Sequence, residues 1–390
     1  MKAAFFHDSK LKYDKNGIYY TNGGLTKEYL QRYLKIFEEI TMITRKEQVN
    51  EEKIDKYSVT SSKNIKFNCI DKLDIVSLLF GKYNKVIKKE VKNNEFIIIR
   101  LPSVIGIIAC HYAKKYKKKY VIEMVGCPWD SLWNYGNLKG KIVAPIMYIL
   151  NKYYIKRAPN VIYVSKEFLQ NRYPTKGRNI GVSDVNIDFI KQDIEKNRLK
   201  KIDSKEEKNI YKIGLIGSLN VNFKGHDTAI KALSILNRNN IKIEMHFLGV
   251  GDKSRWFKLI DKCNVEENVY FDGALPGGES VYQWMDSIDL YWIPSLQEGL
   301  PRALVEAMSR GCPVVGTKTG GIPELIDESC IIRKKSYKQL ARKTINIINN
   351  KEMMKKLSIQ NFEKSLEFEK EKLEKERSKF YLECIRQRIV

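Results

Sequence analysis

The chain has 390 residues, of which 43% are hydrophobic and 30% are charged. This length exceeds what one ordinary core serves, so we expect two domains of roughly 200 residues each. The 22 Tyr, 15 Phe and 5 Trp residues exclude a disordered chain. The longest apolar runs, such as residues 142–150, are well short of the roughly 20 residues that a spanning helix needs.

The formal net charge is +24, of which residues 1–200 carry +18 and residues 201–390 carry +6. A lysine-rich solvated surface explains this excess without any partner. The alternative is that the first half faces an anionic surface, such as a membrane, a lipid diphosphate or nucleic acid. The apolar run at the N-terminus is too short for a signal peptide. We expect a cytoplasmic protein, with peripheral contact at the inner face of a membrane left open.

In the first half, short apolar runs alternate with helical patterns. Strands are expected at residues 2–7, 40–44, 95–100, 120–125 and 160–164, and helices at 26–37, 104–115, 139–157 and 166–172. A polar, weakly patterned joint follows at residues 200–209. Two α/β domains in series are therefore predicted.

The second half shows the same alternation more clearly. Strands are expected at residues 211–216, 241–248, 268–271, 289–293 and 313–316, and helices at 227–238, 252–263, 280–287 and 301–310. This order is typical of a parallel sheet with helices on both faces. Ligands of such sheets bind beyond the carboxyl ends of the strands. The tail, residues 365–388, is expected to form a long charged helix that packs along the body.

The segment Gln297-Glu298-Gly299-Leu300-Pro301 lies between an expected strand and an expected helix. Backbone amides of Gly299 and Leu300 would then lie at the positive end of a helix, where a phosphate binds. Glu298 and Glu306 are separated by seven residues, and both carboxylates could accept hydrogen bonds from sugar hydroxyls. The spacing alone favours the simpler interpretation, a capped helix that carries one surface Glu and one salt-bridged Glu.

The stretch from Pro294 through Gly-Cys-Pro-Val-Val-Gly316 to Gly320-Gly-Ile-Pro-Glu-Leu-Ile326 closely resembles the retaining family-4 glycosyltransferases of the GT-B fold. The resemblance implies two Rossmann-like domains facing across a cleft, with a C-terminal helix that packs back on the body. It implies domains at residues 1–200 (acceptor side) and 209–364 (nucleotide-sugar side), and a helix at 365–390 that returns to the first domain. It also implies that Glu298 contacts the transferred sugar and Glu306 the nucleotide ribose.

A second loop, residues 216–225, follows the first strand of the second domain. Lys224 in this loop can reach a diphosphate as a point charge, although in so lysine-rich a chain a solvated lysine is equally ordinary. Lys224 matches the lysine of the family that the chain resembles. Ser218 occupies the usual arginine position, which removes one cation from the expected donor site.

Two further glycine turns are candidates for donor contact. Gly23 and Gly24 allow the backbone to approach the donor phosphates closely, as the resemblance implies; a plain turn is the alternative. Gly273 and Leu275 resemble the base-contacting loop of the family, and a simple turn after a strand would explain them equally well.

The acceptor side is less defined in the sequence. Many relatives carry a histidine where this chain has Val125, and neither His7 nor His111 is assigned that role. Trp129 and Asp130 are the candidates for acceptor contact, and Arg100 is a further candidate at the lip of the acceptor site.

The expected function is retaining transfer of a hexosyl or N-acetylhexosaminyl group in cell-surface polysaccharide synthesis. The donor would be a nucleoside-diphosphate sugar, with a UDP-sugar favoured, and the acceptor a glycan or lipid-linked glycan. Lys224 and Glu298 would be the catalytic residues, with no metal and no cofactor required. The alternatives are a nucleotide-sugar epimerase or a phosphorylase of related fold, and a basic protein that binds nucleic acid or a membrane. The diffuse charge argues against nucleic acid.

Overall fold

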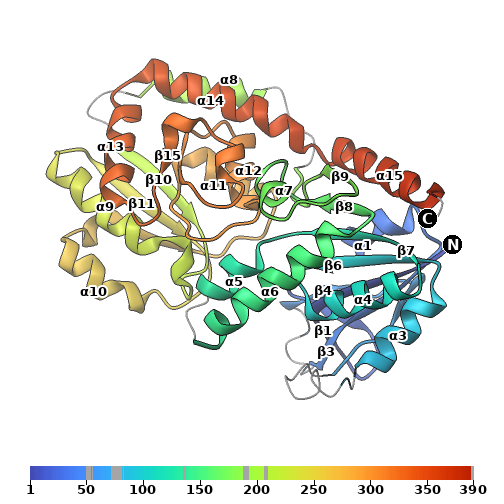
Figure 1. The fold of residues 1–390 in the computed structure, drawn as a ribbon. Helices are drawn as coiled ribbons and strands as arrows, with labels where there is room; N and C mark the ends of the chain where they lie inside the picture. Colours follow the sequence, from blue (N-terminus) through green and yellow to red (C-terminus); the bar gives the residue numbers. More distant parts are fainter. Residues whose placement is uncertain are drawn as a thin grey trace. The chain divides into compact units, whose positions relative to one another are not determined.

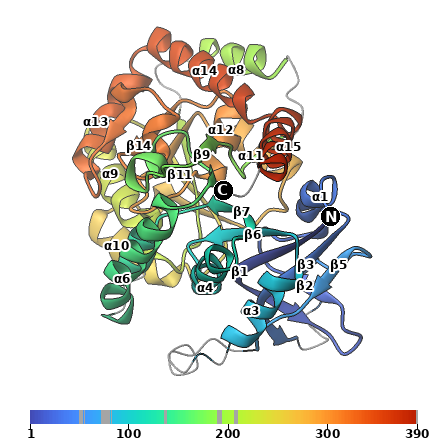
Figure 2. The same cartoon turned by 45° about the vertical axis from the view of Figure 1, so that its right-hand side comes forward.

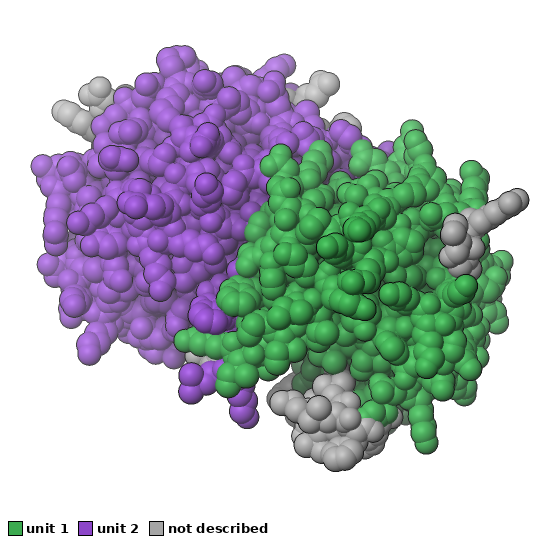
Figure 3. All heavy atoms as spheres, viewed as in Figure 1, with its two compact units in different colours: residues 1–129, 141–182, 374–390 green, residues 130–140, 183–373 purple. Residues whose placement is uncertain are grey.

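The computed structural model describes the chain except residues 50–53, 55, 72–80, 82, 135–137, 188–192, 206–209 and 388–390. It divides into two compact units, coloured separately in Figure 3. Unit 1 comprises residues 1–129, 141–182 and 374–390, and unit 2 comprises residues 130–140 and 183–373. Of the expected joint at residues 200–209, the last four lie outside the described residues.

The helix α8 (Asp193–Asp203) overlaps the start of that joint and belongs to unit 2. Its Arg198 is 4% exposed and donates hydrogen bonds to the backbone oxygens of Arg310, Ile288 and Met285. The boundary expected at residue 200 therefore falls inside unit 2. The chain returns to unit 2 after Val182 instead, and this guanidinium fastens α8 to that unit.

The sheet of unit 1 has a parallel centre and an antiparallel edge. Its strands are β1 (Lys2–Tyr13), β2 (Tyr19–Thr21), β3 (Glu39–Gln48), β4 (Ser58–Val59), β5 (Ile65–Phe67), β6 (Phe96–Leu101), β7 (Lys119–Met124), β8 (Asn160–Tyr163) and β9 (Arg178–Gly181). The parallel strands follow the order β5-β3-β1-β6-β7-β8-β9, while β2 and β4 pair antiparallel beside β1. Buried side chains on both faces of β6 and β7 are those expected of a sheet covered on both sides.

Helices cover both faces of this sheet (Figure 1). They are α1 (Lys27–Leu34), α3 (Asn84–Asn93), α4 (Val104–Lys115), α6 (Leu138–Lys156, which begins in unit 2), α7 (Phe168–Arg172) and the end of α15 (Lys370–Arg386). One face carries α3, α4 and α6, whose apolar side chains share a core cluster with alternate residues of β1, β6 and β7. The other face carries α1 and α15, which lie side by side (Figure 2) and whose Tyr33 and Tyr381 rings are in contact.

A buried carboxylate joins the C-terminal helix to this sheet. Glu123 of β7 is 1% exposed. It accepts hydrogen bonds of 2.8 Å from the hydroxyls of Tyr33 and Tyr381, and it pairs with Arg100 at 3.1 Å and Arg377 at 3.3 Å. Since a buried charge is costly unless it is paired and hydrogen-bonded, these four partners fix residues of α1, β6, β7 and α15 to one another.

Unit 2 contains a parallel sheet with the order β12-β11-β10-β13-β14-β15. Its strands are β10 (Tyr211–Ile216), β11 (Ile243–Leu248), β12 (Val269–Gly273), β13 (Leu290–Ile293), β14 (Val314–Thr317) and β15 (Ile331–Ile332). Its helices are α8, α9 (His226–Arg238), α10 (Ser254–Cys263), α11 (Glu279–Ser287), α12 (Arg302–Ser309), α13 (Tyr337–Ile348) and α14 (Lys351–Ser365), and α5 (Pro128–Asn134) lies at the division between the units. Two helix groups form, with α9 packed on α10 and α13, and α14 packed on α8 and α12.

The two parallel sheets confirm the prediction of an α/β chain with two Rossmann-like domains. The expected C-terminal helix is observed as α15. None of the described helices is both long and apolar enough to cross a membrane.

Candidate active site

The strand order of unit 2 reverses between β10 and β13. From β10 the chain proceeds to β11 and β12 on one side, and the later strands β13, β14 and β15 lie on the other side. The connections that leave β10 and β13 therefore diverge. In open parallel sheets, ligands bind beyond the carboxyl ends of the strands at such a switch point, which directs attention to residues 217–225 and 294–301.

Lys224 and Glu298 meet at this switch point. Lys224 ends the short 3₁₀ helix η2 (Asn222–Lys224) in the loop after β10, and Glu298 lies in the loop after β13. The Lys224 Nζ lies 2.7 Å from the Glu298 Oε1, with the two side chains 27% and 9% exposed. A backbone hydrogen bond of 2.7 Å from the Leu296 amide to the Phe223 carbonyl joins the same two loops. The sequence-predicted catalytic pair is therefore in direct contact.

Two glycines allow the loops to approach so closely. Gly225 has φ +82°, and a Cβ there would lie 2.3 Å from the Pro294 carbonyl oxygen. Gly320, in the loop after β14, has φ +55°, and a Cβ there would lie 2.1 Å from the Glu298 carbonyl oxygen. A side chain at either position would meet both a strained backbone conformation and a backbone clash. The positions of Lys224 and Glu298 thus depend on glycine in neighbouring loops.

Glu306 lies on α12, whose N-cap is Pro301. Pro301 therefore precedes the helix, whereas the sequence pattern places it in the first turn. Partial burial raises the pKa of the Glu306 carboxyl, and the positive charge of Arg302 opposes that shift. The first-turn amides of α12 lack intrahelical partners and point toward the preceding loop.

The hydroxyl of Tyr291 in β13 is affected by the charges of Glu298 and Glu306. Its ring is fully buried, and its hydroxyl accepts a hydrogen bond of 3.4 Å from the Ile216 amide. Burial raises the pKa of this phenol most, and the negative charges of Glu298 and Glu306 raise it further. Both glutamates thus act on the buried Tyr291 hydroxyl through their charge. The sequence pattern gives no sign of this role for Tyr291, since an aromatic residue in a strand is read as core.

The other donor candidates of unit 2 follow the carboxyl ends of strands. Ser218 follows β10, and its Oγ accepts a hydrogen bond of 3.4 Å from the Asn220 amide. The Gly299 carbonyl accepts a hydrogen bond of 2.7 Å from the Gly321 amide, and Leu300 comes directly before the N-cap of α12. Gly273 ends β12, and Leu275 after it is 39% exposed. The parallel sheet thus gathers these residues along one edge.

A cation other than Lys224, Arg255 of α10, contacts the loop after β10. The Arg255 Nη2 donates a hydrogen bond of 2.5 Å to the Asn222 Oδ1. Burial, together with the positive charges of Arg255 and Lys224, lowers the pKa of His226 to about 4. The His226 ring lies between Phe247 and Trp256, with ring centres 5.1 Å from each. Neither Arg255 nor His226 belongs to a motif by which the sequence could have singled it out.

The remaining candidates divide between the units. Gly23 and Gly24 lie in unit 1 before α1, with no positive φ, and a Cβ on Gly24 would meet no atom within 4 Å. The Trp129 ring packs edge-on against Tyr148 in unit 1, and Asp130 belongs to unit 2.

Arg100 also lies in unit 1, where its guanidinium is engaged by Glu123 and by the Tyr29 hydroxyl. These contacts are sufficient to explain why an arginine lies at position 100. Contact between Arg100 and an acceptor stays a prediction. Within the described part of the chain, no group of three or more His, Cys, Asp or Glu side chains is arranged to hold a metal ion.

The chain is similar to known proteins over its whole length. Residues 195–364 match the family model described as glycosyl transferases group 1. Protein CapJ of Staphylococcus aureus is 32% identical over 388 residues, which cover 98% of this chain and 95% of that protein. The putative colanic acid biosynthesis glycosyltransferase WcaL of Escherichia coli (strain K12) is 36% identical over 111 residues, 27% of each chain.

A solved structure extends the comparison to the fold. The crystal structure of Anabaena Alr3699/HepE in complex with UDP is 16% identical and has a TM-score of 0.67, over 98% of this chain and 100% of that one. This likeness confirms the expected GT-B fold. Together with the family match and the full-length similarity to CapJ, it identifies the chain as a glycosyltransferase that belongs to the glycosyl transferases of group 1.

Proposed function

We propose that this enzyme is a retaining glycosyltransferase of cell-surface polysaccharide synthesis. It moves a sugar from a nucleoside-diphosphate sugar, with a UDP-sugar favoured, to a glycan or lipid-linked glycan. The observation that carries the proposal is the 2.7 Å contact between Lys224 and Glu298 at the switch point of the unit 2 sheet. The UDP in the HepE structure supports the donor class, and the colanic acid named for WcaL supports the polysaccharide class.

Transfer breaks the bond between the sugar C1 and the diphosphate oxygen, which leaves with the electron pair. A hydroxyl oxygen of the acceptor forms the new bond to C1 and passes its proton to the departing diphosphate oxygen. The Lys224 ammonium group, aided by the first-turn amides of α12, stabilises the negative charge that develops on the diphosphate. Arg255 of α10, which is hydrogen-bonded to Asn222 of the same loop, supplies a second cation where Ser218 replaces the usual arginine. Gly23 and Gly24, which carry no side chain, are proposed to let the backbone approach the donor phosphates closely.

The two glutamates divide the donor between them. Glu298 accepts hydrogen bonds from hydroxyls of the transferred sugar and stabilises positive charge near C1. Glu306 accepts hydrogen bonds from the ribose hydroxyls, and Gly273 and Leu275 contact the base. A carboxylate makes stronger hydrogen bonds with hydroxyls than a neutral acceptor does, so each glutamate orients its sugar. The 2.7 Å contact with Lys224 fixes the position of the Glu298 carboxylate beside the leaving group.

The proposal also assigns residues to acceptor binding and to contact with a membrane. Arg100, Trp129 and Asp130 are proposed to contact the acceptor. The basic first half of the chain, with +18 of the net charge, is proposed to make peripheral contact with the inner face of a membrane. Transfer is proposed to require neither a metal nor a cofactor.

The test combines a donor panel with two variants. UDP-, GDP- and ADP-sugars are screened for the rise in melting temperature that a bound ligand produces by mass action. We expect one base to give the largest shift, Glu298→Gln to retain that shift while transfer falls, and Glu306→Gln to reduce the shift itself. Release of nucleoside diphosphate with growth of the glycan supports transfer. Wild-type transfer by both variants would show that the site is assigned incorrectly, and phosphorolysis dependent on pyridoxal phosphate would show a different enzyme.

A further inference from the structure

The helix α6 carries a row of exposed apolar side chains on one face. Leu138, Ile142, Ile146, Ile149 and Tyr153 are 77%, 69%, 54%, 64% and 44% exposed. Their spacing of four, four, three and four residues places them on one stripe of an α-helix. Single exposed apolar residues are ordinary, but a contiguous row of this kind marks an interaction surface.

Cations border this row on both sides. Lys139, Lys141, Lys152, Lys156 and Arg157 are all exposed, and residues 138–157 contain no Asp or Glu. At 100° per residue, Lys139 and Arg157 lie on one side of the row and Lys141 and Lys152 on the other. In the part of the chain that the structure describes, Lys139, Lys152, Lys156 and Arg157 pair with no carboxylate. Their charges are therefore available to an external anion.

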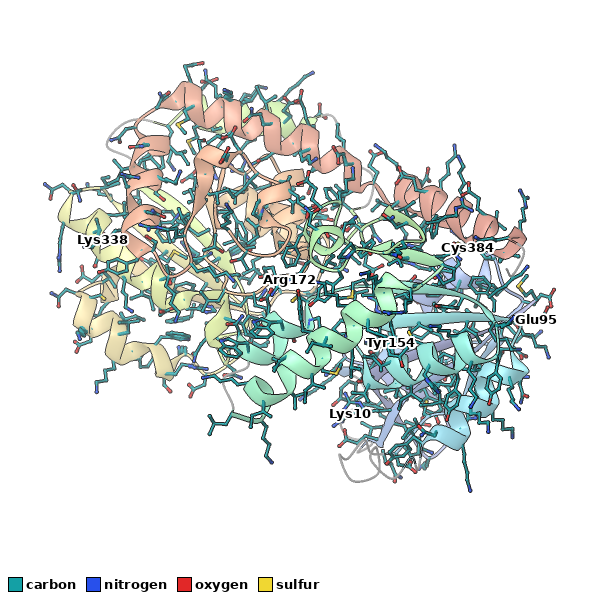
Figure 4. All side chains as sticks on the ribbon, in the orientation of Figure 1. Lys10, Glu95, Tyr154, Arg172, Lys338 and Cys384 are labelled. Atoms are coloured by element: carbon teal, nitrogen blue, oxygen red, sulfur yellow. The ribbon has the colours of Figure 1, made fainter. Side chains whose placement is uncertain are left out.

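The positive charge continues beyond the end of α6. A pocket of about 260 Å³ is lined by Lys114, Lys117, Lys118, Lys119 and Arg157, among others. The Arg157 guanidinium also lies 3.9 Å from the centre of the Tyr153 ring, which ends the apolar row. Figure 4 marks Tyr154 on α6 and Cys384 of α15, which also lines this pocket. Apolar row and cationic pocket are thus joined through one arginine, and a phosphate group of a lipid has the size and charge to enter the pocket.

We propose that α6 binds the surface of an anionic phospholipid bilayer, with its apolar row among the acyl chains and the bordering cations at the lipid phosphates. An interfacial helix combines an apolar face with a face rich in Lys and Arg, as α6 does. Charge decides against a second copy of this chain, because pairing two α6 helices would bring ten cations together between chains that each carry +24. A nucleic acid would match the cations but would leave the isoleucines exposed to water.

This inference rests on the membrane contact in the proposed function and assigns that contact to one helix. It does not depend on the donor chemistry. For an enzyme with a lipid-linked acceptor, α6 would hold the chain at the surface where the acceptor lies. Because each Lys or Arg near an anionic surface contributes modestly, binding should need the apolar row and the cations together.

The test is co-sedimentation of the full chain with vesicles of phosphatidylcholine alone or mixed equally with phosphatidylglycerol. The row variant is Ile142→Ser with Ile146→Ser and Ile149→Ser, and the charge variant is Lys152→Gln with Lys156→Gln and Arg157→Gln. The matched controls are Phe257→Ser with Leu366→Ser and Leu382→Ser, and Lys338→Gln with Arg342→Gln and Lys372→Gln; all of these are exposed residues elsewhere.

We expect binding to the mixed vesicles that falls about tenfold or more in each α6 variant and stays near the wild-type level in both controls. Absence of wild-type binding, or equal binding by the α6 and control variants, would overturn the proposal. So would a wild-type dimer that the row variant converts to a monomer without lipid. The melting-temperature shift with the sugar nucleotide is measured for every variant. A missing melting-temperature shift together with intact vesicle binding would contradict the donor assignment alone. A normal shift together with missing vesicle binding would contradict the α6 assignment alone.

Discussion

The Lys224 ammonium and the Glu298 carboxylate lie 2.7 Å apart although 74 residues of sequence separate them. The contact joins the two loops at the switch point of the unit 2 sheet, because Lys224 lies in the loop after β10 and Glu298 in the loop after β13. The pair is neutral as a whole, so an arriving diphosphate meets a cation whose position is already fixed. Fixed charges of this kind need no reorganisation at the moment of reaction.

Replacing Lys224 with Met removes the charge and keeps most of the aliphatic chain. We expect kcat to fall by about 10² to 10³, since the charge acts on the departing diphosphate. Lys231→Met, on the exposed surface of α9, is the matched control and should keep the wild-type rate. Steady-state kinetics with the best donor of the panel measure both variants. A Lys224→Met enzyme with wild-type kcat would remove this residue from the catalytic machinery.

Glu306 should lower the stability of the folded enzyme while it serves donor binding. Burial raises the pKa of its carboxyl above the ordinary 4.5. The folded state then holds the proton to a higher pH than the unfolded chain does, so stability is lost as the pH rises through this range. Glu306→Gln should therefore be at least as stable as the wild type at pH 7.

The same variant should bind the sugar nucleotide about 10- to 100-fold more weakly, the loss of charge-assisted hydrogen bonds. Thermal unfolding with and without donor measures both effects. A Glu306→Gln variant that is less stable than the wild type and binds the donor normally would contradict the assignment of Glu306 to donor binding.

Patterned elements could be predicted from the sequence, and contacts set by strand order could not. The bounds of α4 and β10 agree with the apolar periodicity to the residue, because both elements carry continuous core-facing side chains. The strand β9 (Arg178–Gly181) was not predicted, since its residues are at least partly exposed, only Ile180 among them has a large apolar side chain, and its backbone makes the pairing with β8. β1 also extends six residues beyond the expected end, past a register shift after Phe6.

In the candidate site too, the residues could be predicted from the sequence but their contacts could not. The resemblance pointed to Glu298 and Lys224, yet their approach depends on the order of β10 and β13, which no local pattern encodes. Glu123 lies near the end of a largely apolar strand, and its partner Arg377 is more than 250 residues away. Neither the pairing nor its burial leaves a signal in the neighbouring sequence.

His226 should make unit 2 sensitive to acid. Burial lowers the pKa of its ring from 6.5 to about 4. Below pH 6.5 the unfolded chain therefore binds a proton that the folded protein resists, and stability falls as the pH drops toward 4. At pH 5 this loss is about 2 kcal/mol. His226→Phe, which keeps an aromatic ring between Phe247 and Trp256, should unfold with a smaller difference between pH 7 and pH 5. An unchanged pH dependence in calorimetry would exclude His226 as its source.

Gly24 should tolerate a side chain in the folded protein but not in the donor complex. A Cβ there would meet no atom within 4 Å, and its φ is not positive. Gly24→Val should therefore keep the wild-type melting temperature and weaken donor binding. Gly320→Ala is the contrasting variant, because its Cβ would lie 2.1 Å from the Glu298 carbonyl oxygen, and it should lose both stability and transfer. Unaltered donor affinity in Gly24→Val would leave the glycine turn without a donor role.

The ion pair of Glu123 and Arg377 should hold α15 on unit 1. Both side chains are at most 3% exposed, and removal of one partner leaves a buried charge with fewer partners, which typically costs about 3–5 kcal/mol. Arg377→Ala should therefore lower the free energy of unfolding by a comparable amount and increase amide exchange along α15. Lys379→Ala, an exposed position on the same helix, is the control for helix propensity and should change little. If both variants exchanged at the wild-type rate, α15 would be held by its apolar contacts, such as that of Tyr381 with Phe37, and the carboxylate cluster would contribute nothing measurable to its docking.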